Sequence, residues 1–357
     1  MKKILFGTCA IAILLALAFW KPKDPEAWPK EIGANFSDKV LVLSTRVVNP
    51  RFPKLSDEQF ELFLNELKGN IKDQLGIQAD FLFDVNYSIK EFFSYREKFI
   101  GGREALLRQY MKKYNLKSVE NIEDLYQRLK WDFELPSNHL DYADLLTLVA
   151  ESTNENHTDL SGKFKTVDAL LKEIARIHFE KFRELEKIPV EDGQPLLLKE
   201  GFNEFPEWAA YLREEPLEGF ILTNQPLISF KEPTAAIHSS LRGGITAGFS
   251  LDNKSQYGSV VVMSTFPFLF QNELLDEMRD FEPTSGMMPA YLAAYTTHEF
   301  GHSFVYWGHY FEKGCIMNPA AALKIKKWYE ETRNKENCTA NYREDYRAAF
   351  MAPFEER

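Results

Sequence analysis

The chain has little cysteine and a deficit of positive charge. It contains three cysteines in 357 residues, and 43 lysines and arginines against 53 acidic residues. So few cysteines exclude a small scaffold held together by disulfide bonds. The net charge of −10, without any basic stripe, argues against nucleic acid as a partner.

Long hydrophobic runs are also scarce. The one such run, Ile4 to Trp20, follows two lysines and contains the A-x-A sequence Ala16-Leu17-Ala18. This pattern is typical of a secretory signal peptide, although about 17 apolar residues would also serve as a membrane anchor. We therefore expect an exported protein (periplasmic, secreted or anchored facing outward). It would touch a membrane only through residues 1–20, if they are not cleaved.

The candidate catalytic and metal-binding residues lie between Thr296 and His309. His298-Glu299-Phe300-Gly301-His302 is an H-E-x-x-H sequence. Residues four apart share one face of a helix, so His298 and His302 can bind one zinc ion through their imidazole nitrogens. Glu299 would lie beside the ion, where it can take a proton from a zinc-activated water.

The sequence after this motif resembles the metzincin group of zinc peptidases, which combine H-E-x-x-H with a glycine turn, a third histidine and a methionine turn. The usual motif has six steps from the second to the third histidine, whereas this chain has seven and carries Val305 at the position of the glycine. Gly308 would supply a comparable turn. The resemblance implies His309 as the third zinc ligand and Met317 as the apolar floor under the histidines. Without that turn, water or a carboxylate would replace His309.

Among metzincins, the chain is most similar to the archaemetzincins. Cys315-Ile316-Met317 matches their C-x-M sequence, and Cys338 falls at the last position of their C-x-x-C. In that group four cysteines hold a second zinc, but here Tyr310 and Lys335 replace two of them. The resemblance therefore implies one zinc per chain and a disulfide between Cys315 and Cys338, as export would permit. Two buried free cysteines are the alternative.

An α/β fold is expected from the order of elements near the start. Lys39 to Val48 is apolar and β-branched, Ser56 is a candidate N-cap for a helix that runs to Leu75, and residues 77–85 resume a strand. Strand–helix–strand order is typical of α/β domains. The metzincin resemblance further implies a mixed twisted sheet with an active-site helix and a methionine turn.

The rest of the chain suggests a large helical insertion and a catalytic core. Helical spacing of apolar residues recurs at 103–114, 122–131 and 167–185, with a polar loop expected at 152–162. The histidines in this region have no ligand partner at a recognisable spacing: His139, His157 and His178. The expected organisation is a signal peptide or anchor at 1–20, the N-terminal βαβ part at 21–86, the helical insertion at 87–190, and the zinc-binding core at 191–357.

Two strands are expected shortly before the zinc motif, at residues 243–250 and 259–265. Metzincins use an edge strand in this region to pair with extended substrate, so the resemblance implies substrate contact there. The alternative is a hairpin that belongs only to the core sheet. His238 lies nearby but is not assigned to zinc. A final helix is expected at 320–333.

These observations predict an exported zinc-dependent metallopeptidase that acts on a peptide or protein substrate. One alternative is a gluzincin-type peptidase with Glu330 or Glu331 as the third ligand. The other is a catalytically inactive zinc-binding module that serves adhesion or assembly.

Overall fold

The computed structural model describes most of the chain after residue 38. The described residues are 39–100, 108, 112, 119–134, 140–198, 203–204, 207–208, 219–229, 236–252, 259–304, 307, 309, 314–321 and 323–332. The expected signal segment at 1–20, Cys338 and most of the helix expected at 103–114 lie outside these residues.

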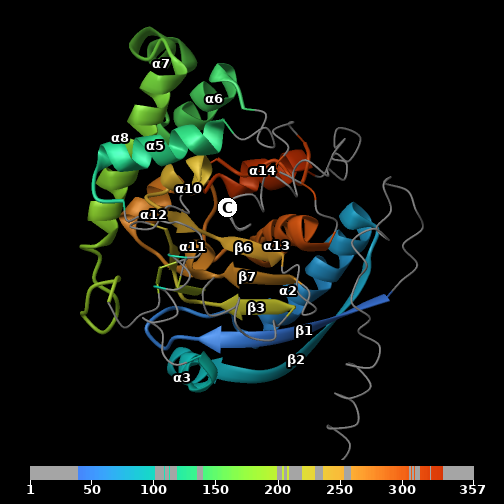
Figure 1. Cartoon of the computed structure of the whole chain (residues 1–357). Helices are drawn as coiled ribbons and strands as arrows, with labels where there is room; N and C mark the ends of the chain where they lie inside the picture. Colours follow the sequence, from blue (N-terminus) through green and yellow to red (C-terminus); the bar gives the residue numbers. More distant parts are fainter. Residues whose placement is uncertain are drawn as a thin grey trace, which may run out of the picture.

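Five strands form a mixed sheet in the order β2-β1-β3-β7-β6 (Figure 1). The strand β1 (Lys39–Val48) pairs in parallel with β2 (Gln78–Ser88) and with the central strand β3 (Phe220–Thr223). β7 (Ser259–Ser264) continues the parallel sheet, whereas β6 (Gly248–Asp252) pairs with β7 antiparallel. The α/β class expected from the sequence is therefore confirmed.

The connection from β1 to β2 is the helix α2 (Asp57–Asn70), which begins where the sequence predicts. The Ser56 hydroxyl accepts a hydrogen bond from the Gln59 amide at 3.1 Å, and the Gln59 side chain accepts one from the Ser56 amide at 3.0 Å. This capping box satisfies two backbone donors that the first helical turn leaves unpaired. A π-helical turn (Ile71–Leu75) follows, and Gly76 ends it with a φ of 71°.

Two helices lie side by side against one face of the sheet, α2 and the long α13 (Met288–Phe304), as Figure 1 shows. Phe63 of α2 and Phe300 of α13 both pack on Phe220 of β3, with ring centroids 6.3 Å and 5.6 Å away. Most of α13 is apolar and buried, as expected of a helix that is hydrophobic on nearly every side. Histidines on this helix are therefore held within the core of the molecule.

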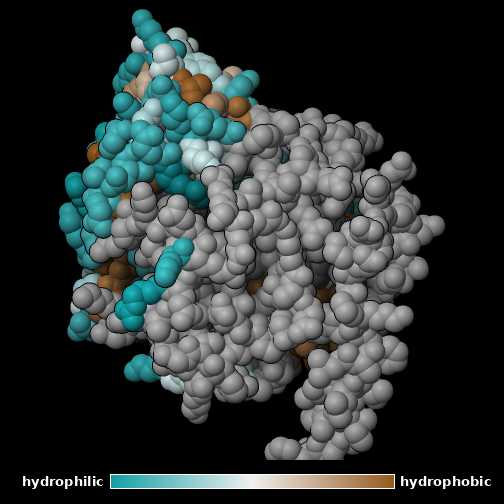
Figure 2. Space-filling view, in the orientation of Figure 1, coloured by the Kyte–Doolittle hydropathy of each residue, from teal (hydrophilic) through white to brown (hydrophobic). Residues whose placement is uncertain are grey.

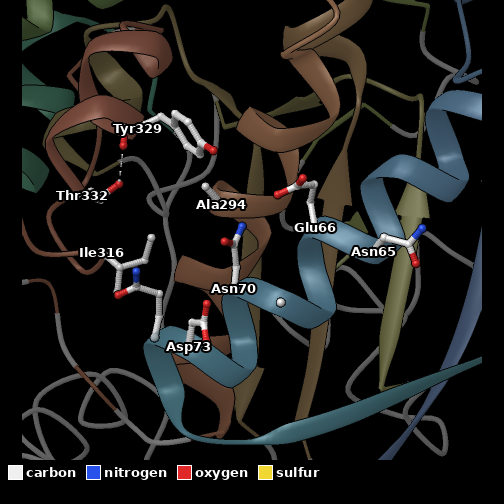
Figure 3. Close-up of a pocket in the computed structure, with 10 residues that line it drawn as sticks. Asn65, Glu66, Asn70, Asp73, Ala294, Ile316, Tyr329 and Thr332 are labelled. Carbon is white, nitrogen blue, oxygen red and sulfur yellow. Dashed lines mark hydrogen bonds between the residues drawn. The ribbon is translucent and has the colours of Figure 1, made fainter. Parts of the chain in front are cut away.

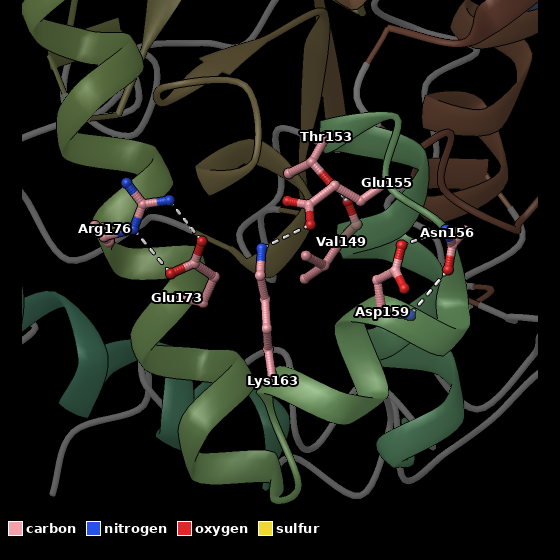
Figure 4. Close-up of polar contacts among 8 residues, drawn as sticks. All are labelled: Val149, Thr153, Glu155, Asn156, Asp159, Lys163, Glu173 and Arg176. Carbon is pink, nitrogen blue, oxygen red and sulfur yellow. Dashed lines mark hydrogen bonds and ion pairs between the residues drawn. The ribbon is translucent and has the colours of Figure 1, made fainter.

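A second hydrophobic core lies among four helices of the middle of the chain. They are α5 (Ile122–Phe133), α6 (Tyr142–Thr153), α7 (His157–Lys163) and α8 (Val167–Leu185), called here the helical segment. Its outer surface is mainly hydrophilic (Figure 2). Exposed pairs on that surface include Lys163 with Glu155 at 2.8 Å and Arg176 with Glu173 at 2.6 Å (Figure 4). Pairs of this kind stabilise by less than about 1 kcal/mol, so the apolar core holds the segment together.

The polar loop expected at 152–162 is wrong for most of its length, because α6 runs to Thr153 and α7 begins at His157. Asn156 caps this helix by accepting a hydrogen bond from the Asp159 amide at 2.8 Å. Leu160 is buried in the core of the helical segment. One well-placed leucine and a side-chain cap therefore make a helix from a sequence with little apolar periodicity.

The remaining elements are short helices and strands. They are α3 (Ile89–Ile100), β4 (Leu227–Ile228), α10 (Ile237–Ser240), β5 (Ile245–Thr246), α11 (Phe266–Leu269), α12 (Glu273–Met278) and α14 (Ile325–Thr332). β4 and β5 form a separate two-stranded antiparallel sheet. None of the helices formed by the described residues is both long and apolar enough to cross a membrane.

Candidate metal centre

Three histidines lie close together at the C-terminal end of α13 and could bind a metal ion: His298, His302 and His309. One nitrogen from each ring lies within 4.8 Å of the others. His298 and His302 are buried, whereas His309 is partly exposed. The structure therefore brings together all three histidines that the sequence predicted as ligands.

The Nε2 atoms of His298 and His302 lie 3.1 Å apart. Two nitrogens bound to one zinc at about 2.0–2.1 Å, with a tetrahedral angle between them, would be about 3.3 Å apart. The two nitrogens are this close because His298 and His302 are four residues apart on α13, which places their rings one turn apart on the same face of the helix.

The other nitrogens of these rings show which atoms are available to a metal. Nδ1 of His298 lies 2.7 Å from the Ile316 carbonyl oxygen, and Nδ1 of His302 lies 2.6 Å from the Trp307 carbonyl oxygen. A carbonyl oxygen only accepts hydrogen bonds, so each Nδ1 carries the proton and each neutral ring keeps a lone pair on Nε2. The two lone pairs face each other, an arrangement that a cation between them stabilises.

Burial keeps all three rings neutral, which is the form that binds metals. Loss of contact with water lowers the pKa of His302 to about 4, and the hydrogen bond to Trp307 opposes this shift in part. Burial is also the main cause that holds the pKa of His298 and of His309 well below the ordinary range. No competing proton therefore occupies the Nε2 atoms at neutral pH.

The chain turns back at the end of α13 before it reaches His309. The Trp307 amide donates a hydrogen bond to the Gly301 carbonyl at 3.1 Å, and the Trp307 carbonyl contacts His302 as described above. His309 then follows with its ring centroid 4.8 Å from that of His302 and 5.4 Å from that of His298. The turn expected at Gly308 lies outside the described residues, but the seven-step spacing does bring His309 to the other two histidines.

Glu299 is buried next to His298. Burial raises the pKa of its carboxyl group to about 8, and the positive charge of Arg242 opposes this shift. A carboxyl group with a raised pKa beside a candidate metal site is the usual state of a residue that accepts and returns protons near neutral pH.

Met317 and Cys315, on either side of Ile316 along the chain, are both fully buried. The Met317 sulfur packs directly against Gly301, between the two histidines of α13. Cys315 is disulfide-bonded. Because Cys338 lies outside the described residues, its pairing with Cys315 stays a prediction.

The carboxylates proposed for the alternative ligand set are not part of the centre. Among the described residues, the group of side chains suited to a metal contains the three histidines and neither Glu330 nor Glu331, both of which lie on α14. Two further histidines are not part of this group. His157 is exposed on α7, His178 is buried on α8, and His139 falls outside the described residues.

Two residues of α10 and its following turn also lie near the centre: His238, which the sequence did not assign to zinc, and Arg242, which no motif in the sequence indicated. The His238 ring centroid lies 5.1 Å from that of His309, and the planes of the two rings are nearly perpendicular. Arg242 is fully buried and donates hydrogen bonds to the Tyr295 hydroxyl at 3.2 Å and to the Ala320 carbonyl. More than fifty residues separate them from the zinc motif, so no local spacing indicates their position.

A separate polar pocket of about 460 Å³ lies between α2, α13 and α14 (Figure 3). Side chains of α2 and the turn after it supply most of its polar wall, including Glu66, Asn70 and Asp73. Ala294 and Ile316 form its inner wall, and none of the three histidines lines it. The pocket therefore neighbours the metal centre without being part of it.

Comparisons with family models, with curated proteins and with solved structures gave no match to this chain.

Proposed function

We propose that this protein is an exported, zinc-dependent metallopeptidase of the metzincin type. The observation that carries the proposal is the approach of the His298 and His302 Nε2 atoms to 3.1 Å, with His309 close to both. Glu299, which follows His298 in the chain, is buried on the same helix. The sequence features that support export and the metzincin type are the N-terminal apolar run, the third histidine and the downstream methionine.

The three histidines suit zinc by their chemistry. Imidazole nitrogens are among the preferred ligands of Zn²⁺, and catalytic zinc sites use three protein ligands and keep one position open. Both buried rings also have the carbonyl partners that commonly orient metal-binding histidines. When bound, such an ion lowers the pKa of a bound water to about 7 and polarises a carbonyl group.

Glu299 moves the proton in this proposal. Its carboxylate oxygen accepts a proton from the attacking water and then delivers it to the nitrogen of the departing amine. Burial favours this role because the raised pKa makes the carboxylate a stronger base than an exposed glutamate. The peptide bond is thereby hydrolysed to a carboxylic acid and an amine.

An extended peptide would approach along β6. This strand is last in the order of the sheet and lies beside α13 (Figure 1). Backbone groups at a sheet edge can pair with an added strand, which would align the peptide with the metal centre.

The proposal is tested by incubating the purified full chain with a mixture of peptides and identifying the products by mass spectrometry. We expect internal or terminal cleavage that stops when a zinc chelator is added and returns when zinc is restored. Zinc bound at one per chain without any cleavage would instead favour the inactive adhesion or assembly module.

A further inference from the structure

His238 is a fourth histidine at the metal centre. Its ring packs against the His309 ring with centroids 5.1 Å apart and planes at 87°. It does not belong to the group of three ligand atoms that converge on one point. His238 is therefore a neighbour of the ligands, and its side chain is partly exposed at the rim of the centre.

The short helix α10 holds His238 in place through contacts with the helical segment. The Ile237 amide, at the start of α10, donates a hydrogen bond to the Asp132 carboxylate of α5 at 3.0 Å. Ile237 and Leu241 are buried in the core of the helical segment, on either side of His238 along the chain. Four residues could not form a stable helix alone, so these contacts determine where the ring lies.

The turn after α10 adds a second constraint. Gly243 and Gly244 have φ angles of 68° and 90°, a region that other residues rarely adopt. A β-carbon on Gly243 would lie 2.9 Å from Cβ of Lys181 on α8, so the turn packs tightly on that helix. The Lys181 ammonium group donates a hydrogen bond to the Leu241 carbonyl at 2.8 Å. Both ends of α10 are therefore fixed to the helical segment.

The ring nitrogens of His238 are available for a further hydrogen bond. The described part of the chain offers them no hydrogen-bond partner. A histidine ring carries at least one N–H group in either of its charge states. A donor held in place in this way, with no partner among the described residues, is suited to a ligand oxygen at the metal centre.

We propose that His238 donates a hydrogen bond to the carbonyl oxygen of the peptide bond held at the metal centre. The inference rests on the proposed peptidase function. Negative charge develops on this oxygen as water adds to the carbonyl carbon, and a preorganised N–H donor stabilises that charge. The helical segment would thus contribute to catalysis through the residue that it positions.

The test uses the full chain loaded with cobalt, whose visible spectrum reports the ligands of the ion. Three variants are compared with the wild type: His238→Ala, His238→Gln and the control His157→Ala, which removes an exposed histidine from α7. For each protein we measure the cobalt content, the cobalt spectrum and the kcat of any peptide cleaved. We also measure the dissociation constant of acetohydroxamic acid, whose carbonyl oxygen stands in for that of a peptide.

We expect His238→Ala to keep the cobalt content and spectrum, and to lose about 10- to 100-fold in hydroxamate affinity and in kcat. His238→Gln, which retains an N–H donor, should restore part of the hydroxamate affinity and part of kcat. His157→Ala should leave the hydroxamate affinity and kcat unchanged. Unchanged hydroxamate affinity in His238→Ala would overturn the inference while leaving the metal centre intact. Loss of cobalt from that variant would also overturn it, by making His238 a ligand. A wild type that binds no cobalt would refute the proposed function itself.

Discussion

The sulfur atom of Met317 packs against the α-carbon of Gly301 so closely that a β-carbon on Gly301 would collide with it. Gly301 lies on α13 between His298 and His302. The Met317 side chain can therefore approach α13 this closely only because residue 301 has no side chain. The contact therefore packs Met317 against the turn of α13 that carries the two histidines.

We predict that Gly301→Ala lowers the free energy of unfolding by about 1–3 kcal/mol, the usual cost of forcing extra volume into a packed core. Zinc affinity should fall as well, because either the buried Met317 side chain or α13 must shift to make room. The control is Gly69→Ala on α2, where an added β-carbon meets nothing within 4 Å. Alanine should stabilise that helix by up to about 1 kcal/mol. Equal melting temperatures for the two variants would contradict this account.

Lys181 makes stability depend on pH. Burial lowers the pKa of its ammonium group to about 8, with the charges of Lys324 and Arg242 adding to the shift and those of Glu184 and Glu277 opposing it. The unfolded chain holds this proton up to a pKa of about 10.4. Between these values the unfolded state binds more protons, so the stability should rise with pH over this window.

We expect Lys181→Met to abolish this contribution, which is measured as the difference in unfolding free energy between variant and wild type from pH 7 to pH 10.5. Lys172→Met on the exposed side of the same helix serves as the control. A difference that stays constant across the window for Lys181→Met would show that the buried ammonium group does not titrate there.

The third ligand is tested by zinc affinity in competition with a chelator. His309→Ala should weaken binding by a large factor, because catalytic zinc sites rely on three protein ligands. Glu330→Ala and Glu331→Ala should bind zinc as the wild type does, since neither carboxylate joins the histidine group. A stronger effect from either glutamate would favour the gluzincin-type arrangement.

Thiol counting tests the predicted disulfide between Cys315 and Cys338. We expect no free thiol from this pair in the denatured, unreduced protein, and two after reduction. The bridge would close a loop of about 20 residues and stabilise the fold by roughly 3 kcal/mol. Two free thiols before reduction would rule it out.

Local patterns were sufficient to predict several elements of the fold. α8 runs from Val167 to Leu185 as its apolar spacing predicts, and α2 begins after its Ser56 cap. The close approach of His298 and His302 was also predictable, because helix geometry alone brings residues four apart together.

Long-range contacts account for what the sequence did not predict. The last helix was expected from Ala320, but α14 begins at Ile325. The Asp280 carboxylate accepts hydrogen bonds from the amides of Lys326 and Lys327 at 2.9 Å and 2.8 Å, so a residue 46 positions away caps its first turn. His238 reaches the metal centre for a similar reason, since its position depends on packing against a distant core.

The most direct test measures zinc content and peptide hydrolysis on the same samples of the wild type and of Glu299→Gln. The proposed role of Glu299 is to carry a proton, so the amide should leave zinc at one per chain while hydrolysis falls to background. Hydrolysis at the wild-type rate in Glu299→Gln, or the loss of zinc together with activity, would contradict the central claim that this buried carboxylate is the base of a zinc peptidase.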